Sequence, residues 1–307
     1  MNVSQLSHRE LLERLAGPGL FLNVGPFVFS IQTEIRQIAD GLCLLYGDFP
    51  LAGTEEFADY HICFSKTRTW RRGVRPYVIV RVNGDCPASP VPLDQVYAVF
   101  EGCLNWCMYT QAYQYLIIHA AAIERDGKAV IMPAPPGSGK STLCAGLVNR
   151  GWRLLTDELT LIDTGSRAIV PLSRPISLKN DSIDLIRKLA PDAVIGPMSP
   201  NTVKGTIAHM KPPSESVARI GEYCRPAWLV VPKYRVGAGS VAGEINKGEA
   251  FMRVAESAVN YMTLGKVGFD LVSAMIDQTA CHRFEYSNLD EAVRWFDALS
   301  LSDKPDQ

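Results

Sequence analysis

Long apolar runs and an excess of charge of one sign are both missing from this sequence. No apolar stretch approaches the roughly 20 residues that a membrane-spanning helix needs. The 31 Lys and Arg residues are balanced by 32 Asp and Glu residues, and the formal net charge is −1. This balance does not favour nucleic acid or an anionic membrane as a partner. The first residues also lack the basic flank and apolar core of a secretory signal. We therefore expect a cytoplasmic protein without a membrane or nucleic-acid partner.

The eight cysteines form no CxxC pair. Cys103 and Cys107 stand four residues apart on a predicted helix, but no second pair or nearby His completes a tetrahedral metal site. We expect reduced and mostly buried thiols, as is typical of a chain that stays in the cytosol.

The chain is long enough for two domains, and its character changes near residues 111–116. Residues 1–114 alternate β-rich runs with amphipathic helices, which predicts a small α+β domain of unknown role. Its expected elements are strands at 27–31, 60–64 and 77–82 and helices at 35–46 and 96–107. The loop at 66–75 holds five cations around Trp70, and a solvated hairpin loop is favoured there over a patch for an acidic partner or nucleic acid.

Residues 115–307 open with two apolar runs, 116–123 and 129–132, that Asp126-Gly127 separates. Asp-Gly between such runs is a strong hairpin signal. The second run leads into a glycine-containing loop with Gly-Lys-Ser, and a helix at 143–150 follows. Strand, loop and helix in this order are typical of a P-loop, whose backbone N–H groups and helix N-terminus bind nucleotide phosphates.

In a P-loop the lysine, here Lys140, reaches the β- and γ-phosphates of ATP, and the following hydroxyl, here Ser141, binds Mg²⁺. The first position is usually Gly and is Ala134 in this chain. The predicted nucleotide-binding residues are Ala134, Pro135, Pro136, Gly137, Ser138, Gly139, Lys140, Ser141 and Thr142.

Two acids, Asp157 and Glu158, follow the predicted strand at 152–155, directly after the P-loop helix. A carboxylate there can take the proton from an attacking hydroxyl, and its neighbour can hold the metal through water. The alternative, that both are ordinary turn residues, stays open on spacing alone.

These motifs together resemble the catalytic domain of the HPr kinase/phosphorylase family. The likeness covers residues 119–163 and continues more weakly to about residue 260. It is closest to the HPr kinase-related proteins that occur in biosynthetic gene clusters. The matching segments are His119-Ala120-Ala121, Gly139-Lys140-Ser141, Asn149-Arg150-Gly151, Leu154-Leu155-Thr156-Asp157-Glu158, Ser177-Leu178-Lys179-Asn180 and Lys204-Gly205-Thr206.

The resemblance implies an α/β P-loop kinase domain of the HPr kinase C-terminal type at 115–307, preceded by the smaller α+β domain. It also implies His119 as a site residue and a homo-oligomer, because members of the family form ring-like hexamers. The family's acidic pair is Asp-Asp, whereas this chain has Asp157-Glu158, so the sequence leaves open which acid is the base. The family's glycine-rich signature after the acids is not recognisable, which leaves open HPr as substrate and the reverse phosphorolysis.

We therefore expect an ATP- and Mg²⁺-dependent kinase that phosphorylates the hydroxyl of a serine. The serine would belong to a small protein or peptide from the same biosynthetic cluster. Two alternatives remain: a kinase for a small metabolite such as free serine or a sugar, and a regulatory protein that binds ATP without transferring phosphate. The expected catalytic residues are Asp157, Glu158, Lys140 and His119, and the expected metal ligands are Ser141 and Glu158.

Two further segments carry expectations. Residues 174–219 are rich in polar residues, Pro and Gly, and this predicts a long irregular stretch that forms a lid or substrate loop, with a solvated loop as the alternative. Residues 289–299 place Leu289, Val293, Phe296 and Leu299 at helical spacing, which predicts a packing helix.

Overall fold

The computed structural model describes residues 1–67 and 76–301. Within them the chain is a mixed α/β protein with four sheets. Most of the basic loop expected at 66–75 lies outside the described residues. No helix among the described residues is long and apolar enough to cross a bilayer.

The N-terminal part is built on a five-stranded sheet in the order β1-β2-β3-β4-β5. Its strands and helices agree with the expected elements at 27–31, 35–46, 60–64, 77–82 and 96–107, which are confirmed as β2, α2, β3, β4 and α3. The elements are η1 Val3–Gln5, α1 His8–Ala16, β1 Leu20–Val24, β2 Phe27–Thr33, α2 Arg36–Leu45, β3 Tyr60–Lys66, β4 Tyr77–Val82, β5 Val91–Pro92, η2 Leu93–Gln95 and α3 Val96–Gln111.

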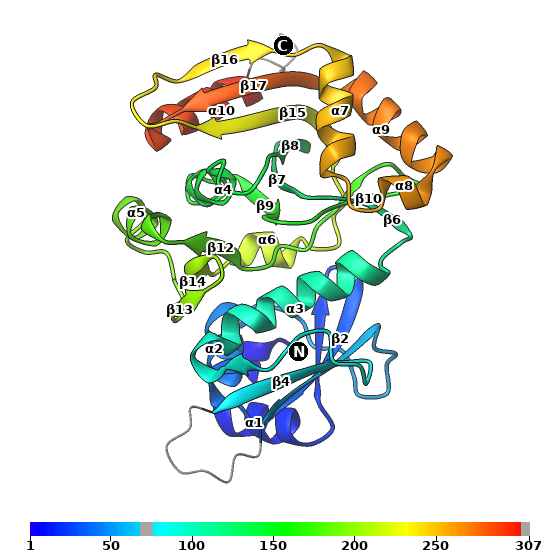
Figure 1. Ribbon diagram of the computed structural model, residues 1–307, viewed down its shortest axis with the longest axis vertical. Helices are drawn as coiled ribbons and strands as arrows, with labels where there is room; N and C mark the ends of the chain where they lie inside the picture. The colour runs from blue at the N-terminus through cyan, green and yellow to red at the C-terminus, as the bar shows by residue number, and fades with distance from the viewer. Residues whose placement is uncertain (68–75, 302–307) are drawn as a thin grey trace.

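Helix α3 lies between the rest of the N-terminal part and the remainder of the molecule (Figure 1). Its apolar face, with Phe100 and Leu104, belongs to one buried core with α2 and the five-stranded sheet. The same core takes in Ile117 and Leu161 from a three-stranded antiparallel sheet. That sheet has the order β11-β10-β6 and consists of β6 Tyr115–Ile118, β10 Thr160–Asp163 and β11 Ile169–Val170.

The six-stranded sheet that carries the predicted P-loop has the order β16-β17-β15-β8-β7-β9. Three neighbouring strands, β8, β15 and β17, run parallel, and the others pair antiparallel. The strands are β7 Ala120–Arg125, β8 Lys128–Pro133, β9 Arg153–Thr156, β15 Arg225–Tyr234, β16 Val241–Glu244 and β17 Ala280–Tyr286.

Helices cover both faces of this sheet, since two separate apolar cores flank it. One core includes α4 Lys140–Val148 and α10 Leu289–Leu301, and the other includes α7 Lys247–Ser257 and α9 Lys266–Gln278, with α8 Tyr261–Leu264 packed against it. Leu289, Val293 and Phe296 of α10 are buried, so the predicted packing helix is confirmed.

The Asp-Gly hairpin is confirmed, because β7 and β8 pair antiparallel around Asp126 and Gly127, both with positive φ (54° and 78°). The single strand expected at 116–123 is wrong. The chain bends at His119, and β6 and β7 on either side of the bend enter different sheets. His119 is therefore a bend residue and not a strand residue.

The expectation of a long irregular stretch at 174–219 is also wrong. This segment forms a three-stranded antiparallel sheet in the order β12-β14-β13, with two short helices. Its elements are β12 Ile176–Lys179, α5 Asp181–Leu189, β13 Ser199–Thr202, β14 Gly205–Met210 and α6 Ser214–Ala218. The buried side chains of Ile176, Leu178, Ala208 and Met210 pack into the core beside α4, which explains why a polar and glycine-containing segment is ordered.

Candidate functional site

The loop between β8 and α4 has the geometry expected of an anion-binding turn. Gly137 and Gly139 have φ values of 84° and 85°, a region that residues with a side chain rarely adopt. A Cβ on Gly139 would stand 2.7 Å from the Tyr286 hydroxyl oxygen, so the site also excludes a larger residue sterically. Helix α4 starts at Lys140 without a side-chain cap from Gly139, which leaves its first backbone N–H groups facing the loop.

A cleft of about 440 Å³ opens over this loop. Pro135 to Thr142 line one side, and His119, Glu158, Ser177, Lys179 and Lys204 are among the residues on the other. Ala134 is buried at the end of β8, behind the residues that line the cleft. The volume lies within the range of about 300–1,000 Å³ that is usual for ligand sites.

Three buried polar atoms have no hydrogen-bond partner among the described residues: Lys140 Nζ and Ser138 Oγ of the residues that line the cleft, and Asp157 Oδ1 in an adjacent small cavity. The Lys140 side chain is only 7% exposed, and burial lowers its pKa. A buried cation and a buried carboxylate oxygen without partners cost free energy that native proteins normally avoid. A ligand with an anionic group for Lys140 and a cation or hydroxyl for Asp157 would satisfy both.

The pKa values of the two neighbouring acids are shifted in opposite directions. Asp157 directly follows β9, and its Oδ2 accepts a hydrogen bond from the Ser177 backbone N–H at 3.1 Å. Burial, and then repulsion from Glu158, raises the pKa of Asp157 to about 6. Burial alone would also raise the pKa of Glu158, but the cations Lys179 and Arg174 outweigh it and the pKa is lowered. Such a pair separates a carboxylate that can exchange a proton near neutrality from one that stays charged.

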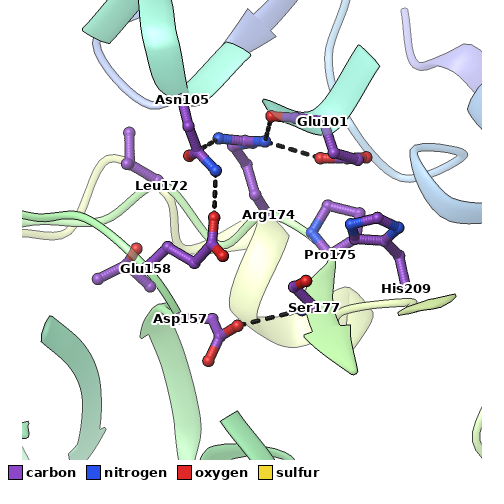
Figure 2. Close-up of a pocket in the computed structure, with 10 residues that line it drawn as sticks. Glu101, Asn105, Asp157, Glu158, Leu172, Arg174, Pro175, Ser177 and His209 are labelled. Atoms are coloured by element: carbon purple, nitrogen blue, oxygen red, sulfur yellow. Dashed lines mark hydrogen bonds and ion pairs between the residues drawn. The ribbon is translucent and has the colours of Figure 1, made fainter. Parts of the chain in front are cut away.

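Glu158 is held in place by a network that begins on α3 (Figure 2). The Asn105 amide donates to Glu158 Oε2, and its oxygen accepts from the Arg174 guanidinium. Lys179 Nζ lies 3.8 Å from the other Glu158 oxygen. Glu158 lines the loop cleft, an adjoining chamber of about 370 Å³ and a small cavity of about 20 Å³, whereas Asp157 lines only the small cavity among these three.

Arg174 is the centre of this network. Its guanidinium pairs with Glu101 Oε2 at 2.7 Å and also donates to the Glu101 backbone carbonyl at 2.8 Å. The hydroxyls of Tyr46 and Tyr97 donate to the same carboxylate at 2.9 and 3.0 Å. Burial, and then Glu101, raises the pKa of both tyrosines, so both remain donors. The ion pair thus joins α2 and α3 to the segment that precedes β12.

Sequence reasoning missed Glu101 and Asn105 and used Arg174 only as the end of a segment. One signal was present: Glu101 stands between Phe100 and Leu104 on the apolar face of a predicted helix. A carboxylate in that position needs a buried partner. Nothing local identified Arg174 as that partner.

His119 lies at the rim shared by the loop cleft and the chamber. Its backbone N–H donates to the Ser257 carbonyl at 2.8 Å, which fixes the bend. Burial, and then Lys140, lowers the pKa of the His119 imidazole to about 4. The ring is therefore neutral near pH 7 and can both donate and accept a hydrogen bond.

Among the described residues, no group of three or more His, Cys, Asp or Glu side chains could hold a metal ion by itself. Cys103 and Cys107 are both free and buried, as expected.

A comparison with protein-family models finds a match to part of this region. The family model described as SynChlorMet cassette protein ScmC matches residues 95–169. The matched stretch is less than half of the chain and runs from α3 through the glycine loop and the acidic pair. No curated protein matches the chain.

Removing the Asp157 charge should stabilise the fold at neutral pH. The folded pKa of about 6 lies above the ordinary 3.8, so the protonated carboxyl favours the folded state. That contribution is complete below pH 4 and is lost as the pH rises through 6. In urea titrations we expect Asp157→Asn to exceed wild type by about 3 kcal/mol at pH 7.5 and by far less at pH 4. Parallel curves for the two proteins across this range would contradict the assigned pKa.

Breaking the Arg174 ion pair should cost far more than replacing it. Arg174→Met leaves the Glu101 carboxylate buried with only the two tyrosine hydroxyls. We expect a loss of about 3–5 kcal/mol in the free energy of unfolding, and a smaller loss in the double variant Arg174→Met/Glu101→Leu. An Arg174→Met protein within about 1 kcal/mol of wild type would show that the pair does not hold the two parts together.

Proposed function

We propose that the chain is an ATP-dependent kinase that transfers the γ-phosphoryl group to a hydroxyl, that of serine in a small protein or peptide. The observation that carries this proposal is that Lys140 Nζ, at the start of α4, and Asp157 Oδ1, just after β9, are both buried and have no hydrogen-bond partner among the described residues. A triphosphate and an acceptor hydroxyl supply what these two atoms lack. The resemblance to the HPr kinase/phosphorylase family supports the same assignment.

In this proposal the backbone N–H groups at the start of α4 and the Lys140 ammonium bind the β- and γ-phosphates. Lys179 and Lys204 line the same cleft and add positive charge on the side opposite the loop. Mg²⁺ would be held by the Ser141 hydroxyl and by Glu158, directly or through water, and would neutralise charge on the phosphates. The lowered pKa of Glu158 keeps this carboxylate charged for that purpose.

Asp157 is the proposed base. The acceptor oxygen attacks the γ-phosphorus, the bond from that phosphorus to the β–γ bridging oxygen breaks, and ADP leaves with that electron pair. The hydroxyl proton passes to Asp157, whose pKa of about 6 suits a base that works near neutrality. The neutral His119 ring orients the acceptor or a phosphate oxygen from the rim of the cleft.

Lys140→Ala should abolish transfer, because no other side chain of the loop is charged. We expect transfer to fall by at least about a hundredfold.

Ser141→Ala should weaken nucleotide binding only when Mg²⁺ is present. ATP binding by calorimetry and transfer from labelled ATP measure the two effects. Lys188→Ala, on the exposed face of α5, is the control for loss of a lysine. Unchanged turnover in Lys140→Ala would refute the assignment of the loop.

Asp157→Asn should lower single-turnover transfer by about 10²–10⁴-fold and leave ATP affinity nearly unchanged. The wild-type rate should fall below pH 6 as Asp157 takes up a proton, and the variant should lack that acid limb. Glu158→Gln should instead raise the Mg²⁺ concentration needed for half-maximal rate. If both variants transfer phosphate at the wild-type rate, the acids are structural and the chain is better described as an ATP-binding module.

A further inference from the structure

An apolar groove of about 390 Å³ lies between α3 and the β13–β14 hairpin. Val80 and Val91 come from the N-terminal sheet, Val99 and Trp106 from α3, and Val203 and Ile207 from the hairpin. The hairpin is fixed to the start of α3, since Gln95 Nε2 donates to the Asn201 carbonyl at 2.8 Å. Both walls of the groove are therefore ordered elements.

The groove continues into the proposed active site. A chamber of about 370 Å³ shares Gly102, Trp106 and Lys204 with the groove. The same chamber shares His119, Glu158 and Lys204 with the cleft over the glycine loop. The three hollows therefore adjoin one another, from the glycine loop past Glu158 to the apolar groove, and Lys204 lines all three.

Gly102 marks the place where the groove and the chamber meet. It is exposed in the middle of the long helix α3, where glycine destabilises a helix relative to alanine. A Cβ at Gly102 would meet nothing within 4 Å. The contrast is Gly41 in α2, where a Cβ would stand 1.9 Å from the Tyr97 ring. Packing among the described residues explains Gly41 and does not explain Gly102.

We propose that the groove binds an extended apolar segment of the acceptor polypeptide, while the serine beside that segment enters the chamber. This inference rests on the proposed kinase function. A free amino acid or a sugar is too small and too polar to cover the valines, Ile207 and Trp106, whereas an apolar peptide would bury them. The absence of a side chain at Gly102 lets the peptide backbone lie close to α3 at the entrance to the chamber.

The test uses two sets of synthetic peptides that carry a single serine, one with Leu or Val near it and one with Asn or Gln there, together with free serine and glucose. Labelled ATP and Mg²⁺ supply the phosphate. We expect wild type to label the apolar set at least about tenfold faster than the polar set, in line with the burial of one or two aliphatic side chains.

A Cβ at Gly102 meets nothing within 4 Å, so we expect Gly102→Leu to extend into the groove and to keep or raise the thermal stability. We expect it to bind Mg²⁺-ATP as wild type does and to lose at least about tenfold in labelling of the apolar set. Val203→Asp, at the exposed tip of the hairpin, should act in the same direction. Gly221→Leu is the matched control, since a Cβ at Gly221 also meets nothing and the residue lies outside the groove.

The outcomes separate the groove from the kinase. Three results would contradict peptide binding in the groove without contradicting the kinase activity. They are equal labelling of both peptide sets, labelling of free serine or glucose instead, and no effect of Gly102→Leu and Val203→Asp. A wild type that binds Mg²⁺-ATP but labels none of these acceptors would also overturn the groove. Failure to bind Mg²⁺-ATP would remove the proposed function itself. Light scattering adds a further outcome: a dimer that Gly102→Leu dissociates would show that a second copy of the chain occupies the groove.

Discussion

The buried ion pair between Arg174 and Glu101 is the interaction on which the arrangement of the site depends. Both side chains are less than a tenth exposed, and they join helix α3 of the N-terminal part to the segment leading into β12. A buried charge is tolerated only when its partners satisfy it, and here two tyrosine hydroxyls and an amide complete the set. The amide is that of Asn105, which also holds Glu158. The N-terminal part therefore helps to position Glu158 through Asn105 of α3, together with Lys179.

Two buried charged groups near the glycine loop, Lys140 and Asp157, lower the stability of the free protein. Lys140 is buried with no hydrogen-bond partner for its Nζ in the described part of the chain, and Asp157 is buried with a raised pKa beside a second carboxylate. Proteins that are selected for stability alone pair or remove such groups, whereas sites that act on charged ligands retain them. Binding of a triphosphate and a metal would compensate both groups at once. Under the proposed function, the same electrostatic cost in the free protein becomes binding energy for Mg²⁺-ATP.

Sequence reasoning predicted what local signals encode. The order of strand, glycine-containing loop and helix, the Asp126-Gly127 turn and the apolar spacing of α10 each depend on neighbours within a few residues, and each is confirmed. It failed where the outcome depends on distant pairing. The composition of segment 174–219 predicts a loop, yet Ile176 to Lys179 pair with β14 about 30 residues later. The network from Arg174 to Asn105 spans 69 residues, and no local pattern identifies such a contact.

The fate of the γ-phosphate decides whether the chain is a kinase of a polypeptide serine. The protein would be incubated with γ-labelled ATP and Mg²⁺ in a fractionated cell lysate, and the label would be followed into polypeptides, small metabolites and free phosphate. We expect the wild-type protein to leave acid-stable label on serine of a polypeptide and the Lys140→Ala protein to leave none. Label that stays in ATP, or appears only as free phosphate, would contradict it.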